Sequence, residues 1–494
     1  MKKIKLEFNN PYKSQKHELF MTGELFSTRD AERKKISYPA AIIQGLAPDG
    51  GLFVPTAYPR ISSDELRQWS NLPYTQLAFQ VKRKLVGQTI PDEVLRDIQV
   101  QAYSADKFSN AFEVAPVENI AEDLFLQNLS LGPTAAFKDM ALQPLAYEMD
   151  YELARMGQML NILAATSGDT GSAAEAGAKG RERLRVFMLS PKYGMSAFQK
   201  AQMGIQSGGN IFNISIINKE NESGFDVCQG LAKKLSKKCG FGALNSTNWG
   251  RVAAQVVYYV SGYLQTAQRI GDEVDFTVPT GNFGNVLAGY IAKRMGVPIR
   301  NLIIATNENN VLETLITKGI YQKRLSQVTS SPSMDITVSS NYERLAFDLF
   351  GRDPELTKRY MEEFETTGKV DLKDFGGGPE DFRELGFFAG SSSHANRLDS
   401  IRWLRDHNGL IIDPHTADGI TVAKQFQTAD KVPMVVMQTA LAVKFESTIQ
   451  EAIGFKPRRE KRFEGLEERV PRGSFHTMEP DANKLESYIK HHLS

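Results

Sequence analysis

The sequence has only two cysteines among its 494 residues, Cys228 and Cys239. A framework of several disulfide bonds is therefore excluded, and a reducing, cytoplasmic location is the simplest expectation. The net charge of +1 gives no electrostatic reason to expect binding to nucleic acid or to an anionic membrane. No uninterrupted apolar run reaches the ~18 residues that a membrane-spanning helix requires. We therefore expect a partner that is neither nucleic acid nor membrane.

Histidine is also absent between His17 and His394. This gap excludes a Ser-His-Asp triad, an HExxH zinc motif and any histidine-based metal cluster from the middle of the chain. We expect no metal site. If this region catalyses a reaction, we expect its proton carrier to be a lysine or a carboxylate.

What the sequence does contain is an alternation of short apolar strands, such as residues 159–166 and 184–191, with helices. Apolar strands joined by helical crossovers indicate parallel sheets covered on both faces, which is the α/β class. A chain of this length is expected to form two or three domains. We predict an N-terminal region over residues 1–112, an α/β domain over 113–245 and a larger α/β domain over 246–494, with a helical insertion near 340–400.

Three segments carry the candidate chemistry. They are GPTAAFKD (residues 132–139) with Lys138, the turn SGDTG (167–171) and the loop PTGNFGN (279–285). Taken singly, each has an ordinary explanation: a surface lysine, a helix cap without a ligand, and a plain loop. The third segment matches neither the P-loop nor the G-x-G-x-x-G pattern, which disfavours a dinucleotide fold.

Taken together, the three segments are what a pyridoxal phosphate enzyme requires. A lysine between apolar residues can carry the cofactor aldehyde as a Schiff base, and its pKa must fall for the amine to be useful. A glycine-rich loop that opens a helix offers backbone N–H groups to a phosphate. The sequence therefore predicts pyridoxal 5'-phosphate as the cofactor.

These segments, in this order, resemble the threonine synthase family, whose members are fold-type II pyridoxal phosphate enzymes. Further segments that carry the resemblance are FSTRD (26–30), GLAPDGGLFVP (45–55), SPSMDITVSSNYERL (331–345), DPHTADG (413–419) and TALAVKF (439–445). The segment 331–345 is typical of the longer, yeast- and enterobacterial-like branch. The resemblance implies a tryptophan synthase β-like arrangement of two open parallel-sheet α/β domains beside an N-terminal region.

The resemblance also implies roles for single residues. Lys138 is the lysine that bears the cofactor and carries protons. The residues implied to contact the cofactor are Lys138, Asp169, Gly281, Asn282, Phe283, Gly284, Asn285 and Thr439. The residues implied to contact the substrate are Thr166, Ser167, Thr170, Asn245, Ser246 and Arg251. Arg251 suits a phosphate because its planar fork meets phosphate oxygens in pairs.

The reaction implied by the resemblance converts O-phospho-L-homoserine and water to L-threonine and phosphate. The expected partner is then a small phosphorylated amino acid, and the expected assembly is a monomer or a homodimer. The charged residues 456–473 are expected to form a solvated surface segment.

Two positions depart from the family pattern, because Leu131 and Leu441 stand where many members have histidine. One explanation is lineage drift with compensated packing. Another is a specialised paralogue that acts on a different amino acid, such as a phosphonate analogue, by altered replacement or elimination chemistry. A non-catalytic homologue is the third possibility, and the intact Lys138 and Thr439 count against it.

Overall fold

The computed structural model describes residues 23–108, 113–166, 168–218, 224–239, 241–242 and 245–493. The N-terminal part combines a small antiparallel sheet, with strand order β2-β1-β3, and a group of helices. Its elements are β1 (Glu24–Ser27), β2 (Ile36–Ser37), α1 (Tyr38–Gln44), β3 (Phe53–Pro55), α2 (Ser63–Trp69), α3 (Tyr74–Val86), α4 (Asp92–Ala102) and α5 (Ala105–Phe108).

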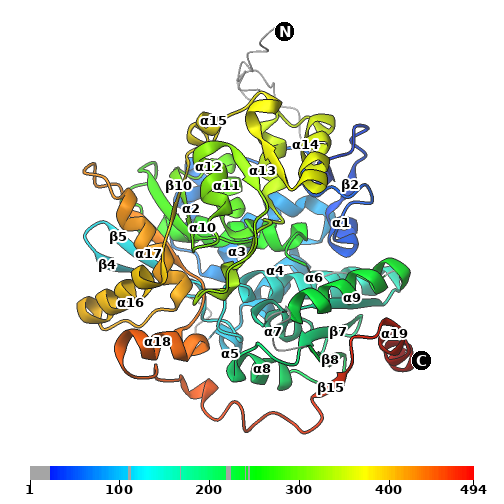
Figure 1. Cartoon of the computed structure of the whole chain (residues 1–494). Helices are drawn as coiled ribbons and strands as arrows, with labels where there is room; N and C mark the ends of the chain where they lie inside the picture. The colour runs from blue at the N-terminus through cyan, green and yellow to red at the C-terminus, as the bar shows by residue number, and fades with distance from the viewer. Residues whose placement is uncertain are drawn as a thin grey trace.

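A four-stranded parallel sheet has the order β15-β8-β7-β6. Its strands are β6 (Leu160–Ala165), β7 (Leu184–Pro191), β8 (Ile211–Ile216) and β15 (Phe475–Met478). The helices around it are α6 (Asp139–Met156), α7 (Asp169–Ala178), α8 (Ala197–Gly204), α9 (Gly224–Cys239) and α19 (Ala482–Leu493). Figure 1 shows β15 and α19, in red at the C-terminus, beside this sheet.

A six-stranded sheet has the order β13-β10-β9-β14-β5-β4 and is parallel except for β4. Its strands are β4 (Val117–Ala121), β5 (Leu124–Asn128), β9 (Val274–Pro279), β10 (Ile299–Thr306), β13 (Phe387–Ser391) and β14 (Met434–Gln438). Its helices are α10 (Trp249–Thr266), α11 (Gly284–Met295), α12 (Val311–Lys318), α16 (His394–Asn408), α17 (Pro414–Phe426) and α18 (Glu446–Ile453). The predicted α/β class with open, mostly parallel sheets is confirmed.

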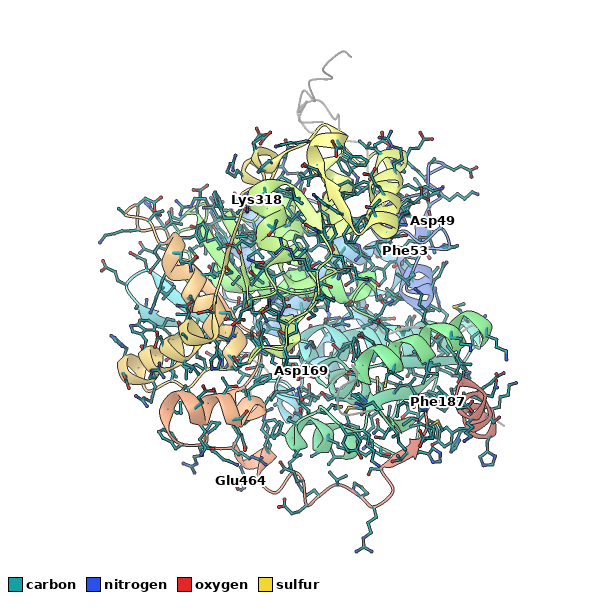
Figure 2. All side chains as sticks on the ribbon, viewed as in Figure 1. Asp49, Phe53, Asp169, Phe187, Lys318 and Glu464 are labelled. Carbon is teal, nitrogen blue, oxygen red and sulfur yellow. The ribbon has the colours of Figure 1, made fainter. Side chains whose placement is uncertain are left out.

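Between α12 and β13 the chain forms a mostly helical insertion. It contains β11 (Ile320–Gln322), α13 (Tyr342–Leu349), α14 (Pro354–Thr367), β12 (Lys369–Asp371) and α15 (Pro379–Glu384). The remaining short elements are the 3-10 turns η1 (Gly87–Thr89), η2 (Pro332–Met334), η3 (Leu372–Phe375), η4 (Ala442–Phe445) and η5 (Lys461–Phe463). The side chains of all these elements fill the space between the layers (Figure 2).

The sheets do not follow the predicted three-part division strand by strand. Strands β4 and β5, from the predicted segment 113–245, pair within the six-stranded sheet, and β15 from the segment 246–494 pairs with β8. The division of the chain into three domains stays a prediction. Among the described residues, no helix has both the length and the apolar character needed to cross a membrane.

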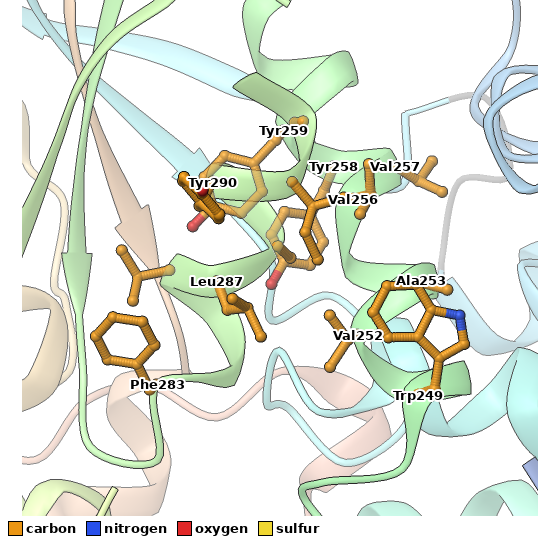
Figure 3. Packing of buried hydrophobic residues seen from close by; sticks show 14 of the residues in the cluster. Trp249, Val252, Ala253, Val256, Val257, Tyr258, Tyr259, Phe283, Leu287 and Tyr290 are labelled. Atoms are coloured by element: carbon orange, nitrogen blue, oxygen red, sulfur yellow. The ribbon is translucent and has the colours of Figure 1, made fainter. Parts of the chain in front are cut away.

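Helix α10 is buried over nearly its whole length and packs against α11. Figure 3 shows Trp249, Val252 and Tyr259 of α10 in one apolar cluster with Leu287 and Tyr290 of α11. Burying such side chains stabilises each by roughly 1.5–3 kcal/mol relative to exposure. This packing fixes the N-terminal ends of both helices, and each of these ends carries residues that the sequence places in the candidate site.

Candidate active site

The candidate site lies at the carboxyl ends of parallel strands. Strands β9, β14 and β5 are neighbours in the six-stranded sheet. Strand β9 leads into the loop 280–283, β14 leads into Thr439, and β5 leads into the segment before Lys138. In open α/β sheets, ligands bind at this edge. The fold therefore brings together segments that lie about 150 residues apart in the sequence, as expected for a parallel sheet with long crossovers.

Lys138 immediately precedes helix α6. The segment before it is held by the segment after β14: the Phe137 N–H donates to the Thr439 carbonyl at 2.8 Å, and the Leu441 N–H donates to the Ala135 carbonyl at 3.2 Å. Ala135 has a positive φ of 57°, a turn conformation that is uncommon for residues other than glycine. The lysine side chain is only 13% exposed. It therefore points into the protein, and the surface explanation of Lys138 does not hold.

The Lys138 ammonium lies 3.3 Å from Oδ2 of Asp169, the first residue of α7. Burial lowers the pKa of Lys138, the Asp169 carboxylate opposes this effect, and the positive charges of Lys444 and Arg251 lower the pKa further. Burial alone disfavours an ionised Asp169. The ammonium groups of Lys138 and Lys444 outweigh it and hold the pKa of Asp169 well below its usual range.

Three further groups contact Asp169, and sequence reasoning singled out none of them. Gln199 donates to Oδ1 at 3.1 Å, Ser333 donates to Oδ2 at 3.1 Å, and the Lys444 ammonium lies 2.8 Å from Oδ1. Ser333 and Lys444 belong to the segments SPSMDITVSSNYERL and TALAVKF. These segments indicated the family. They did not indicate that Ser333 and Lys444 contact Asp169.

The SGDTG turn is shaped by Thr166. Its hydroxyl oxygen accepts the backbone N–H groups of Gly168 at 3.0 Å and Gly171 at 2.8 Å. Thr170 lies in the first turn of α7 and is partly exposed. Ser167 lies outside the described residues. Contact of Thr166, Ser167 and Thr170 with a substrate stays a prediction.

The loop 281–285 leads into helix α11. Phe283 is buried with a positive φ of 65° at the position before the helix, and Gly284 is its first residue. The Asn285 Oδ1 accepts hydrogen bonds from the hydroxyls of Tyr258 at 2.7 Å and Tyr259 at 2.9 Å. Its Nδ2 is buried and has no hydrogen-bond partner among the described residues. A buried donor that lacks a partner is costly, so this helix N-terminus suits a phosphate.

A second set of polar groups stands at the start of α10. Arg251 lies in the first turn and is 5% exposed, and within the described part of the chain its Nε and Nη1 have no hydrogen-bond partner. Burial lowers the pKa of Arg251 to about 10. Oδ1 of Asn245 is also buried without a described partner, and the hydroxyl oxygens of Ser246 and Ser340 are 2.9 Å apart. A buried guanidinium without a counter-charge is the feature expected where an anionic ligand binds.

Residues 340–344 connect these two sets. Nδ2 of Asn341 donates to the carbonyls of Ser246 at 3.1 Å and Asn282 at 3.0 Å. The guanidinium of Arg344 donates to the carbonyl of Thr247 and to Oδ1 of Asn341, both at 2.6 Å. One rigid segment therefore sets the spacing between the loop 281–285 and the start of α10.

Thr439 follows β14 and is 6% exposed. Its N–H donates to the Thr416 hydroxyl at 3.2 Å, while its carbonyl accepts from Phe137, next to Lys138. Thr439 is therefore brought to the lysine segment, as the resemblance implies. Its contact with the pyridine nitrogen of a cofactor stays a prediction.

The structure also locates the two leucines that depart from the family pattern. Leu441 packs against a buried cluster that includes Phe463 and Leu466, and Arg462 donates to the carbonyls of Leu131 at 2.8 Å and Gly132 at 3.0 Å. Both positions therefore border residues 456–473. Most of this segment is exposed, as expected for a solvated surface segment, but Phe463 and Leu466 are buried and Arg459 pairs with Glu446 and Glu467.

Comparison with known proteins agrees with this geometry. The family descriptions "Threonine synthase N terminus", "Pyridoxal-phosphate dependent enzyme" and "Threonine synthase, C-terminal" match residues 24–103, 110–367 and 416–489. The threonine synthase of Methylobacillus glycogenes is 44% identical over 94% of this chain and 99% of its own length. The chain belongs to the threonine synthase family.

Solved structures of threonine synthases share the fold of this family member. A pyridoxal phosphate-bound threonine synthase from Brucella melitensis superposes with a TM-score of 0.88 at 36% identity, covering 95% of this chain and 99% of that one. The threonine synthase from yeast gives a TM-score of 0.88 at 32% identity, with 96% and 99% covered. The fold-type II assignment, the cofactor class and the family resemblance are therefore confirmed.

The unpartnered amide of Asn285 allows a direct test of the cofactor phosphate site. Replacing Asn285 by aspartate keeps the oxygen that accepts from Tyr258 and Tyr259 but turns the buried donor into an acceptor. We expect Asn285→Asp to weaken the binding of pyridoxal phosphate at least about tenfold, because a charge-assisted hydrogen bond is lost. Cofactor affinity is measured by absorbance titration. Tyr259→Phe is the matched control and should bind nearly normally, whereas equal affinity in Asn285→Asp would remove Asn285 from the phosphate site.

Proposed function

We propose that this protein converts O-phospho-L-homoserine and water to L-threonine and phosphate. The observation that supports this substrate is the buried guanidinium of Arg251, whose Nε and Nη1 lack partners among the described residues. A buried guanidinium of this kind suits the phosphate of a substrate. The pairing of a phosphate-type site with this lysine favours a phosphorylated amino acid.

In this proposal Lys138 would bear the cofactor, and Thr439 would face its pyridine nitrogen. The loop of Gly281, Asn282, Phe283, Gly284 and Asn285 would hold its phosphate. When bound, pyridoxal phosphate supplies an electron sink for negative charge that develops beside the amino group. Thr439 is a neutral partner, so the ring nitrogen need not be protonated. The ionised Asp169 can only accept hydrogen bonds, so the cofactor oxygen facing it would have to donate.

The proton transfers fall to Lys138. Its lowered pKa increases the fraction of neutral amine, which can take the proton from Cα and later from Cβ of the substrate. Arg251, Asn245 and Ser246 hold the phosphate until it leaves, and the turn of Thr166, Ser167 and Thr170 orients the substrate carboxylate. Protons then return from the same lysine when water adds at Cβ.

A second candidate function is that of a paralogue acting on a phosphonate amino acid, and it rests on Leu131 and Leu441. The packing of Leu441 against Phe463 and Leu466, together with the Arg462 contact to the Leu131 carbonyl, supports the simpler explanation of compensated packing.

A cytoplasmic location stays a prediction, and so does assembly as a monomer or a homodimer.

The decisive experiment follows phosphate release and threonine formation together, with purified protein, pyridoxal phosphate and O-phospho-L-homoserine. We expect equal amounts of the two products at an ordinary enzymatic rate. Phosphate without threonine would identify an eliminase instead. If neither product forms although the cofactor is bound, the proposed substrate is wrong and a phosphonate analogue becomes the next substrate to test.

A further inference from the structure

The second lysine of the site, Lys444, has no role in the reaction proposed above. It lies in the turn η4, and its side chain is fully buried. Lysine is almost never fully buried unless its charge is paired. The ammonium group has two partners: Oδ1 of Asp169 at 2.8 Å and the carbonyl oxygen of Thr134 at 2.9 Å. Lys444 therefore touches both the carboxylate beside Lys138 and the turn that leads to Lys138.

Asp169 is thus shared between two lysines, one on each oxygen. Lys444 lies closer, at 2.8 Å, and Lys138 lies at 3.3 Å. Without Lys444, the carboxylate would serve Lys138 alone and would favour its charged form. With Lys444 in place, two positive charges compete for one negative charge. A neighbouring cation is one of the ways in which proteins keep a reactive lysine neutral.

We propose that Lys444 is a positioning residue that acts through Asp169: its ammonium engages one carboxylate oxygen and offsets part of the negative charge, so that Lys138 releases its proton more readily. The same ammonium fixes the Thr134 carbonyl and thereby the turn before Lys138. The inference rests on the proposed function only in taking Lys138 as the lysine that reacts with the cofactor.

Other charged groups near this pair do not replace Lys444. Arg251 also bears on Lys138 electrostatically, but the structure records no hydrogen bond or ion pair from it to Asp169. Asp139 is a carboxylate that also feels the charge of Lys444, but its hydrogen bonds come from the Thr134 N–H and hydroxyl, both at 2.8 Å. The other partners of Asp169, Gln199 and Ser333, carry no charge. Lys444 is therefore the cation, besides Lys138 itself, that contacts Asp169 directly.

The test measures the proton affinity of Lys138 itself in the full-length protein freed of cofactor. Acetic anhydride acylates only the neutral amine, and mass spectrometry quantifies the modification of Lys138 at each pH. We expect Lys444→Met to move the midpoint of Lys138 labelling upward by about one pH unit or more, because a cation is lost and Asp169 then serves Lys138 alone. In the holoenzyme, the acid limb of the pH profile of kcat should move in the same direction.

Two variants separate charge from packing. Lys444→Arg keeps the positive charge and should restore a midpoint close to that of the wild type. Lys444 and Lys456 both line a cavity of about 590 Å³. Lys456→Met is the matched control, because the Lys456 side chain is 64% exposed and pairs with Glu446. Its midpoint should equal that of the wild type. If Lys444→Met does not fold, Lys444→Gln, which can still donate to the Thr134 carbonyl, takes its place.

Equal midpoints in the wild type and in the Lys444→Met or Lys444→Gln variant would overturn the proposal. An Arg variant that shifts as far as the Met variant would do the same, because the effect would then be one of packing. These outcomes are independent of the substrate. Failure of the wild-type protein to form threonine would refute the proposed function and leave the labelling result intact.

Discussion

Replacing Lys138 by alanine is expected to abolish both threonine formation and the covalent attachment of pyridoxal phosphate. The buried amine beside Asp169 is the nucleophile of the proposed site and its proton carrier, so its removal takes away both functions. Loss of a nucleophile that is also an acid-base group lowers turnover by at least about 10³-fold. The measurement combines turnover with mass spectrometry of the borohydride-fixed adduct.

The matched control for this variant is Lys179→Ala. Lys179 donates to the carbonyl of Ile205 at 2.8 Å at the protein surface, and it lies at the C-terminal end of α7, the end opposite Asp169. We expect this control to keep both turnover and adduct. A Lys138→Ala variant that retains the wild-type absorbance and the fixed adduct would show that another lysine bears the cofactor.

Replacing Arg251 by alanine is expected to raise KM for the phosphorylated substrate by roughly 30- to 150-fold. This factor corresponds to about 2–3 kcal/mol, the scale of a charge-assisted hydrogen bond to a phosphate. The unpartnered Nε and Nη1 add a second expectation. Because these atoms make no hydrogen bond within the described protein, truncation should leave the melting temperature of the ligand-free protein unchanged or raise it.

The combination of a large KM effect with undiminished stability separates a binding arginine from a structural one. Arg251→Lys should be intermediate, since it keeps the charge but loses the planar fork. Arg269→Ala is the control, because this side chain is 84% exposed and, among the described residues, its ion pair is with Asp272. An unchanged KM in Arg251→Ala would exclude Arg251 from the phosphate site.

The α/β class could be predicted from the sequence, and so could the segments that carry Lys138 and the loop 281–285, because each is encoded by residues that are close together in the chain. The roles assigned to Lys138 and to this loop stay predictions. A turn before Lys138, or glycines and asparagines before α11, can be recognised in a window of a few residues. The family resemblance added the pairing of these segments. The structure then identified the hydrogen-bond and ion-pair partners of the side chains in these segments.

The contacts around Asp169 could not be predicted in this way. Ser333 lies 164 positions from Asp169, and Lys444 lies 310 positions from the Thr134 carbonyl that it binds. Such contacts depend on which strands are neighbours in the sheet, and local patterns do not encode strand order. The burial of Phe463 and Leu466 within the otherwise exposed segment 456–473 was missed for a related reason: the charges around them indicate solvent exposure, while elements from distant parts of the chain cover these two side chains.

The pairing of β15 with β8 has a consequence for how the protein is made. Strand β15 (residues 475–478) lies far beyond β8 in the sequence, so it is synthesised long after β8. Until then β8 (residues 211–216) has an open backbone edge, and unpaired edges of this kind favour association with other chains. A nascent chain, or one truncated before residue 475, is therefore expected to need protection by chaperones although every residue proposed to act in the reaction is already present.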